Sequence, residues 1–157
     1  YIRQESARLV AEGARVRFIC ERSRLSRELQ ALMAGLEEQT ADNDRLHLTV
    51  AINYGGRDEI TRATRRIAAA VKAGELAVED IGPDTIERYL DTAGLPDPDL
   101  VLRTSGEYRV SGFLTWQSVY SEYSFVDVRW PDFTADMFAA EVRGFGRRER
   151  RFGAVAG

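Results

Sequence analysis

The chain has 157 residues, and its 22 Lys and Arg residues against 25 Asp and Glu residues give a formal net charge of −3. This balance excludes a generally basic nucleic-acid-binding protein, and a content of 44% hydrophobic residues is typical of a folded globular domain rather than of a disordered chain. The single Cys and the single His exclude an intrachain disulfide and a zinc site of the Cys/His type.

The sequence also bears on where the protein works. No run of residues reaches the roughly 20 apolar positions that a membrane-spanning helix needs, and no signal peptide opens the chain. We therefore expect a cytoplasmic protein without a transmembrane segment. Because the chain starts at Tyr1 rather than at a methionine, we also expect it to be a fragment of a longer protein.

The hydrophobic pattern predicts strands that alternate with helices. Apolar and charged residues alternate over residues 14–20, which is typical of a strand, and the apolar spacing over residues 25–36 is that of one helix face. A second strand is predicted over residues 46–52, and a second helix follows it with one apolar face. That face carries Ile60, Ala63, Ile67 and Val71.

The second half of the chain continues the alternation. A short helix is predicted over residues 84–90, and strands are predicted at residues 100–102 and 125–128. The last predicted element is an amphipathic helix between residues 133 and 145. Since helices separate the strands, the connections require a parallel sheet. We predict a single α/β domain over residues 1–157, with a mostly parallel sheet and helices on both of its faces.

Two loops at the ends of predicted strands are candidate binding sites, because ligands of such sheets collect at the carboxyl ends of strands. The Asn-Tyr-Gly-Gly-Arg segment at residues 53–57 precedes a helix, so it fits either a tight turn or an anion site. The loop at residues 103–111 is richer, because it contains Arg103, Arg109 and Ser111. Guanidinium groups, hydroxyls and backbone amides together suit a diphosphate.

Residues that follow this loop refine the prediction. Apolar and aromatic side chains occupy residues 113–120, which favours an amphiphilic substrate over a solvated polar loop with one local Arg–Glu pair. Glu122 comes next, and a carboxylate beside a diphosphate is a suitable Mg²⁺ ligand. A glutamate that is ion-paired at the surface is the alternative at this position.

Five segments along the chain form an ordered set. They are Glu38-x-Thr40-x-x-Asn43, AINYGGRDEI at 51–60, PDPDLVLRTSGEYRVSGFLTWQSVYSE at 96–122, WPDF at 130–133 and RRFG at 150–153. In order and spacing they resemble the cis-prenyltransferase family, of the undecaprenyl diphosphate synthase type. The resemblance implies the parallel α/β fold of that family. It also implies an enzyme that condenses isopentenyl diphosphate with an allylic diphosphate, forming a Z double bond and releasing pyrophosphate.

The resemblance assigns roles to residues by position. Arg103, Arg109 and Ser111, with the backbone at Val110, would bind the diphosphate of isopentenyl diphosphate, and Glu122 would bind the Mg²⁺ cofactor. Two further residues match the C-terminal RxG motif, which in the family's dimers reaches the neighbouring subunit and helps to hold a diphosphate. These are Arg151 and Gly153, so the resemblance also implies a homodimer. A peripheral contact with a membrane would serve product release.

The sequence departs from the family at two places. Gly112 stands where the family usually has asparagine. The family's first strand, its helix and its Asp-Gly-Asn and Asn-Trp-x-Arg-Pro motifs are expected upstream of Tyr1, so no catalytic residue is assigned here and the isolated chain is expected to be inactive. The alternative is a non-catalytic partner subunit of a heteromeric cis-prenyltransferase. A generic phosphate-binding α/β domain is a third hypothesis.

Overall fold

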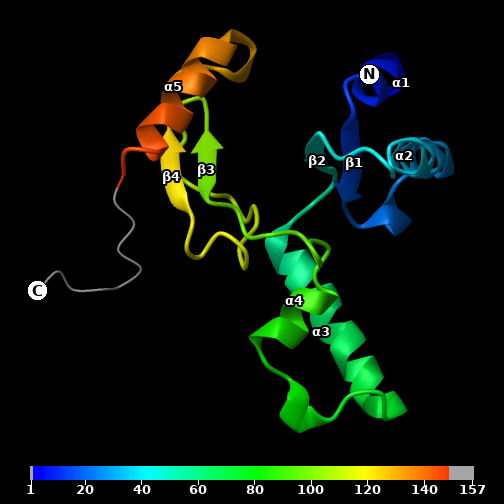
Figure 1. Cartoon of the computed structure of the whole chain (residues 1–157). Coiled ribbons are helices and arrows are strands. Elements are labelled where there is room, and N and C mark those ends of the chain that lie inside the picture. The colour runs from blue at the N-terminus through cyan, green and yellow to red at the C-terminus, as the bar shows by residue number, and fades with distance from the viewer. Residues whose placement is uncertain (1, 149–157) are drawn as a thin grey trace, which may run out of the picture. The chain divides into compact units, whose positions relative to one another are not determined.

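The computed structural model describes residues 2–148, and the chain divides into two compact units, Tyr1–Gly94 (unit 1) and Leu95–Gly157 (unit 2) (Figure 1). Each unit contains one pair of parallel strands with helices beside it. The predicted α/β class with parallel strands is therefore confirmed. That residues 1–157 form one domain stays a prediction.

Unit 1 is built around strands β1 (Ala14–Ile19) and β2 (Leu46–Ala51), which pair in parallel with Ala14 opposite Leu46. Both strands agree with the hydrophobic pattern. The helices of unit 1 are α1 (Ile2–Ala11), α2 (Arg27–Gln39), α3 (Gly56–Ala73) and α4 (Pro83–Tyr89), and the short 3-10 turns are η1 (Arg22–Arg24) and η2 (Val78–Asp80). Helix α1 is an addition to the predicted elements.

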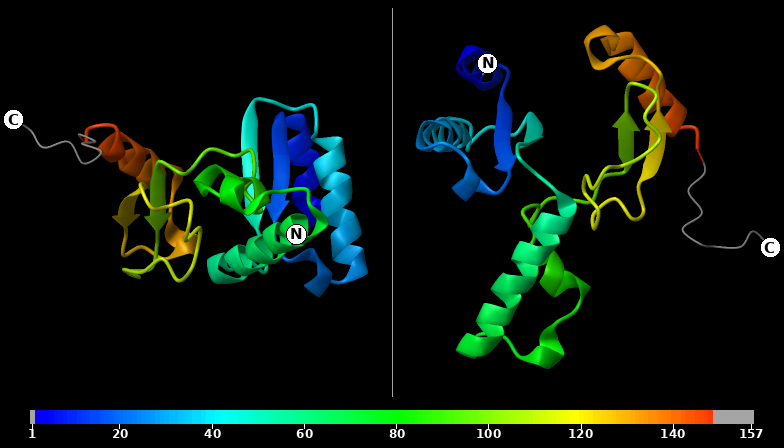
Figure 2. Two further views of the ribbon diagram at one scale, coloured as in Figure 1. Left: turned by 90° about the horizontal axis from the view of Figure 1, so that it is seen from below. Right: turned by 180° about the vertical axis from the view of Figure 1, so that it is seen from behind.

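The core of unit 1 lies between β1 and helices α1 and α2, which lie beside it (Figures 1 and 2). Alternate side chains of β1, including Val16 and Phe18, point to one face and are buried. Met33 and Leu36, one helical turn apart on α2, are buried in the same cluster. The alternating strand pattern and the apolar face of the helix thus form one layer of packing.

Side chains from the end of α2 cover one edge of β1. Three residues that are three positions apart in sequence contact three strand residues that are two positions apart. Asn43 Nδ2 donates to Ala14 O at 2.9 Å, Val16 N donates to Thr40 Oγ1 at 3.0 Å, and Phe18 N donates to Glu37 Oε1 at 2.9 Å. Thr40 and Asn43, which carry part of the family resemblance, therefore satisfy backbone groups of an edge strand.

We expect Thr40→Val to lower the free energy of unfolding by about 1 to 3 kcal/mol, because valine keeps the shape but leaves the buried Val16 N–H without an acceptor. The Thr40 hydroxyl also donates to Leu36 O at 2.8 Å, and this bond is lost as well. Urea unfolding of the variant and the parent measures the difference. Thr64→Val is the matched control, because its exposed hydroxyl bonds only within α3. Equal losses in both variants would contradict the explanation.

Unit 2 contains β3 (Leu100–Arg103), β4 (Glu122–Phe125), the 3-10 turn η3 (Trp130–Asp132) and α5 (Ala135–Phe145). The two strands pair in parallel, with Leu100 opposite Glu122 and Arg103 opposite Phe125. The prediction of a strand over residues 125–128 was wrong in position. Residues 126–128 instead accept hydrogen bonds from the loop after β3, as Val126 O does from Gly106 N at 3.0 Å.

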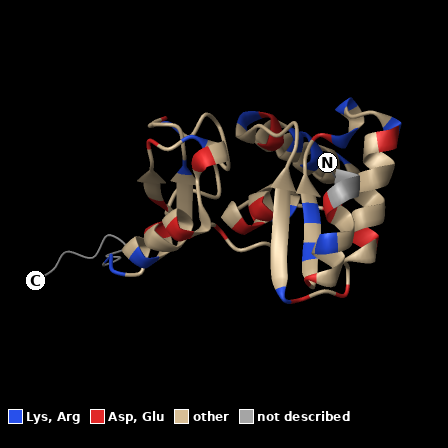
Figure 3. Cartoon of the chain, turned by 90° about the horizontal axis from the view of Figure 1, so that it is seen from above, with Lys and Arg blue, Asp and Glu red and all other residues tan. Residues whose placement is uncertain are grey.

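Figure 3 shows acidic and basic residues interspersed on the helices of both units. Across residues 2–148, the structure contains no helix that is both long enough and apolar enough to span a bilayer.

Candidate functional site

The loop after β3 is closed by the side chain of its first residue. Arg103 lies at the carboxyl end of β3, and its Nη1 donates to Ser111 Oγ at 3.0 Å and to the backbone oxygen of Arg109. The guanidinium group therefore links the two ends of a nine-residue loop. This shape depends on Arg103 and not only on the turn residues.

The turn of the same loop is held against the segment that follows β4. Ser105 N donates to Val128 O at 2.8 Å, and Val126 N donates to Arg103 O at 2.9 Å. Gly106 has a φ of 63°, and a Cβ at this position would lie 3.1 Å from Asp127 Oδ1, so glycine suits it on both counts. Backbone hydrogen bonds thus fix the first half of the loop independently of its charged side chains.

A glutamate lies between the two arginines of the loop. Glu107 Oε2 forms an ion pair with Arg109 Nη2, and Arg103 Nη2 lies 3.8 Å from the same oxygen. That carboxylate oxygen is buried, whereas the Arg109 side chain is 65% exposed. The two guanidinium groups consequently converge on one point of the loop.

A cavity of about 520 Å³ opens beside this loop in unit 2. Arg103, Arg109, Val110 and Ser111 supply its polar part. Its apolar walls come from β3 and the residues just before it, from the start of residues 113–120, and from β4. These residues are Pro98, Leu100, Val101, Leu102, Phe113, Leu114 and Phe125. The cavity therefore joins cationic and hydroxyl groups to an apolar surface, as an amphiphilic anion would require.

The structure brings four of the predicted site residues to this one cavity: Arg103, Arg109, Val110 and Ser111. Arg151 and Gly153 lie outside the described residues. That any of these residues binds a diphosphate stays a prediction.

Glu122 has a partner in this structure. Its Oε2 accepts a hydrogen bond from Arg148 Nη1 at 2.8 Å, which is the ion-paired arrangement that the sequence left open. Because Glu122 pairs with Leu100, it lies about 10 Å along the sheet from the level of Arg103. Within residues 2–148, the structure contains no group of three or more His, Cys, Asp or Glu residues that could hold a metal ion. A Mg²⁺ ion here would need ligand and water oxygens besides Glu122.

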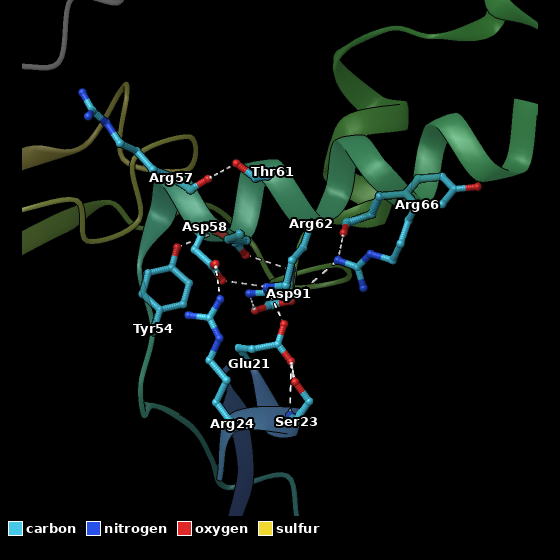
Figure 4. Close-up of polar contacts among 12 residues, drawn as sticks. Glu21, Ser23, Arg24, Tyr54, Arg57, Asp58, Thr61, Arg62, Arg66 and Asp91 are labelled. Atoms are coloured by element: carbon cyan, nitrogen blue, oxygen red, sulfur yellow. Dashed lines mark hydrogen bonds and ion pairs between the residues drawn. The ribbon is translucent and has the colours of Figure 1, made fainter.

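Unit 1 contains a second cavity, of about 500 Å³, at the carboxyl end of β1. Arg62 lines it and bonds to Asp91 through both Nη atoms, at 2.8 and 2.7 Å (Figure 4). Arg62 Nε lies 2.9 Å from Asp58 and 3.1 Å from Glu21. Burial raises the pKa of the neighbouring Cys20 thiol. The lining is an ion-pair network in which carboxylates already occupy the donors of Arg62.

The Asn-Tyr-Gly-Gly-Arg segment belongs to the same region. Tyr54 Oη donates to Glu59 Oε2 at 2.6 Å, and Asp91 N donates to Glu59 Oε1 at 2.8 Å. Glu59 is fully buried and therefore ties the turn after β2 to the segment after α4. Arg57 points away from Arg62 (Figure 4). These contacts fit the tight-turn hypothesis for the segment.

Sequence reasoning did not single out Glu59 or Asp91. It allowed for an Arg–Glu pair in the loop after β3 and gave Glu107 no further role; the structure contains such a pair between Arg109 and Glu107. A signal existed for Glu59, which lies four residues before Ala63 and so falls on the apolar face of α3. A charged residue on such a face requires partners. Asp91 carried no comparable signal, because it lies just after α4 in a segment without regular apolar spacing.

The ion pairs around Arg62 in unit 1 predict that the stability of the fold depends on pH. Hydrogen bonding to Arg62, and then the charge of Arg24, hold the pKa of Asp58 below its usual value. Since the folded-state pKa is lowered, the stabilisation is present above the unfolded pKa and disappears as the pH falls through the folded pKa. We expect the urea midpoint to fall between about pH 5 and pH 2, and to fall less in Asp58→Asn. Identical acid profiles would contradict this assignment, and Asp42→Asn, at an exposed position, is the control.

Comparisons with known proteins identify relatives of this chain in sequence and in structure. The family described as "Putative undecaprenyl diphosphate synthase" matches residues 1–153. The isoprenyl transferase of Agrobacterium fabrum is 48% identical over 156 residues, which cover 99% of this chain and 63% of the relative. The ditrans,polycis-undecaprenyl-diphosphate synthase ((2E,6E)-farnesyl-diphosphate specific) of Pseudomonas syringae pv. tomato is 45% identical over 152 residues, covering 97% and 61%. The chain thus spans less than two thirds of the length of these relatives.

A solved structure extends the likeness to the fold. The lavandulyl diphosphate synthase from Lavandula x intermedia, in complex with dimethylallyl diphosphate, matches with a TM-score of 0.93 and 34% sequence identity. The match covers 97% of this chain and 66% of that chain. The predicted cis-prenyltransferase fold is therefore confirmed, and the chain belongs to the undecaprenyl diphosphate synthase family of prenyltransferases.

Proposed function

We propose that this protein elongates Z-type prenyl chains by condensing isopentenyl diphosphate with an allylic diphosphate and releasing pyrophosphate. One observation carries the proposal: two guanidinium groups and a serine hydroxyl meet apolar walls in a single cavity of a chain of this family. Arg109 and Ser111 would bind the diphosphate of isopentenyl diphosphate, and the backbone at Val110 would support them. Leu100 and Phe113 would contact the five-carbon body of the substrate.

The reaction sets two demands on these residues. A carbon–carbon bond forms between the two substrates, the allylic carbon–oxygen bond breaks, and a proton leaves. The bound diphosphate must hold the alkene in place, which the cationic groups do, and water must be kept from the electron-poor allylic carbon, which apolar walls do.

Mg²⁺ is proposed as the cofactor, with Glu122 as its ligand from this chain. When bound, the ion would neutralise diphosphate charge. Glu122 would exchange its ion pair with Arg148 for the ion, and a single carboxylate suffices because Mg²⁺ retains phosphate and water ligands.

Further parts of the proposal concern the whole protein. We propose a cytoplasmic homodimer in which the RxG residues Arg151 and Gly153 serve the neighbouring subunit, with a peripheral membrane contact for product release. The 157 residues by themselves are proposed to be inactive. The reason is that the family resemblance assigns the catalytic aspartate and the allylic diphosphate site to motifs that this sequence lacks.

The test is incorporation of labelled isopentenyl diphosphate by the full-length protein, with Mg²⁺ or with EDTA, and with dimethylallyl, geranyl or farnesyl diphosphate as primer. We expect metal-dependent incorporation with at least one primer. No incorporation with any primer would overturn the enzyme proposal, and activity only after mixing with a longer homologue would favour the partner subunit. In active protein, Glu122→Gln should raise the Mg²⁺ concentration for half-maximal rate more than the KM for isopentenyl diphosphate. Glu141→Gln, whose carboxylate bonds to Ser124 rather than to a cation, is the matched control.

A further inference from the structure

Glu107 occupies a position that an anionic ligand of the cavity would need. Its Oε2 atom is buried, it forms an ion pair with Arg109 Nη2, and it lies 3.8 Å from Arg103 Nη2. Both arginines line the cavity of about 520 Å³. A phosphate oxygen that binds both guanidinium groups would seek the same Nη2 atoms.

The charge balance of this cluster makes the carboxylate and an anion competitors. Arg103 and Arg109 carry two positive charges, and Glu107 cancels one of them. A diphosphate that approaches the pair meets a like charge a few ångströms away, which disfavours its binding. An anion that binds both Nη2 atoms comes close to Glu107 Oε2, and the repulsion between the two anions favours departure of the carboxylate.

The loop can release the carboxylate without losing its shape. Arg103 closes the loop through Nη1, by its bonds to Ser111 Oγ and to the oxygen of Arg109, and this nitrogen is separate from the one that faces Glu107. The turn at Ser105 and Gly106 is held by backbone bonds to residues after β4. The Glu107 side chain is 35% exposed, so rotation about its own bonds can carry the carboxylate into solvent.

We propose that Glu107 is a built-in substitute for the diphosphate. In the ligand-free protein its carboxylate holds the two guanidinium groups together, and the diphosphate displaces it on binding. The proposal rests on the proposed function, since it assigns the cavity to a diphosphate. It makes Glu107 a positioning residue that organises the empty site and lowers the affinity of the filled one.

The test is a titration of the full-length protein with inorganic pyrophosphate in the absence of metal. Binding is measured by isothermal titration calorimetry. We expect Glu107→Gln to bind pyrophosphate about ten-fold more tightly than the parent, because one opposing charge is removed while the size of the side chain is kept. Glu107→Ala is the second variant and should also bind more tightly. A residue that only supported the loop would give weaker binding when changed, so a gain in affinity shows that the Glu107 carboxylate opposes the anion.

Controls separate this proposal from the proposed function. Glu79→Gln changes the net charge equally at an exposed position in unit 1 and should leave the affinity unchanged. Arg109→Ala should weaken pyrophosphate binding. If the parent and Glu107→Gln both fail to bind pyrophosphate, the cavity is not a diphosphate site and both proposals fall. If the parent binds, Arg109→Ala weakens binding and neither Glu107 variant strengthens it, displacement by Glu107 is overturned while the proposed function stands.

Discussion

Arg109→Ala is expected to raise the KM for isopentenyl diphosphate about 10- to 100-fold in the full-length enzyme, because a hydrogen bond to a charged group contributes about 1.5 to 3 kcal/mol. The side chain is 65% exposed, and its only described ion pair is with Glu107, so its loss should leave the fold intact. Since the proposed contact would hold the substrate both before and during the reaction, kcat should change less than KM. Steady-state kinetics and the melting temperature of the same preparation measure both effects.

Arg103→Ala should have the larger effect of the two arginine variants. Arg103 is 27% exposed, and besides facing the cavity it bonds to Ser111 Oγ and to the oxygen of Arg109, so its removal also opens the loop. We expect a KM effect at least as large as that of Arg109→Ala and a lower melting temperature. Arg129→Ala, at an exposed position of the same unit, is the control. Unchanged KM values in both cavity variants would contradict the assignment of the cavity.

Asp91→Ala is expected to lower the free energy of unfolding by about 2 to 3 kcal/mol, the largest stability effect that we predict for unit 1. Asp91 is 10% exposed and Arg62 is 17% exposed, and two hydrogen bonds of 2.8 and 2.7 Å join them. Without the carboxylate, a nearly buried guanidinium loses its bidentate partner. Asp58 and Glu21 still contact Arg62, which keeps the expected loss below that of an isolated buried pair.

The origin of this loss can be tested by a double-mutant cycle. Urea unfolding of Asp91→Ala, Arg62→Met and the double variant gives the coupling between the two positions. If the ion pair is responsible, the double variant should be much less destabilised than the sum of the single variants. Additive losses would contradict it. Asp42→Ala, at an exposed position, should change the stability by less than about 0.5 kcal/mol.

Local pattern accounts for the elements that were predicted, whereas packing and strand pairing account for those that were not. Strand β1 and helix α2 were predictable because their apolar residues recur at the periods of a strand and a helix. Helix α1 contacts the core cluster through Leu9, and a helix of only 10 residues depends on packing for its stability. Strand β4 begins at Glu122 because it pairs with β3, and no property of its own residues marks that start.

For the candidate site, the sequence predicted which residues take part, but it did not predict which charged side chains pair with one another. Arg103, Arg109 and Ser111 stand out in the sequence because two guanidinium groups and a hydroxyl fall within nine residues at the end of a predicted strand. The sequence by itself therefore determined the family, the alternation of strands and helices, and the loop that lines the cavity. Only the tertiary structure decided that Glu107 lies between the two guanidinium groups and that Glu122 bonds to Arg148. The physical reason is that amphipathic spacing is set within a few neighbouring residues. An ion pair depends on the path of the backbone and on which of several opposite charges lies within reach.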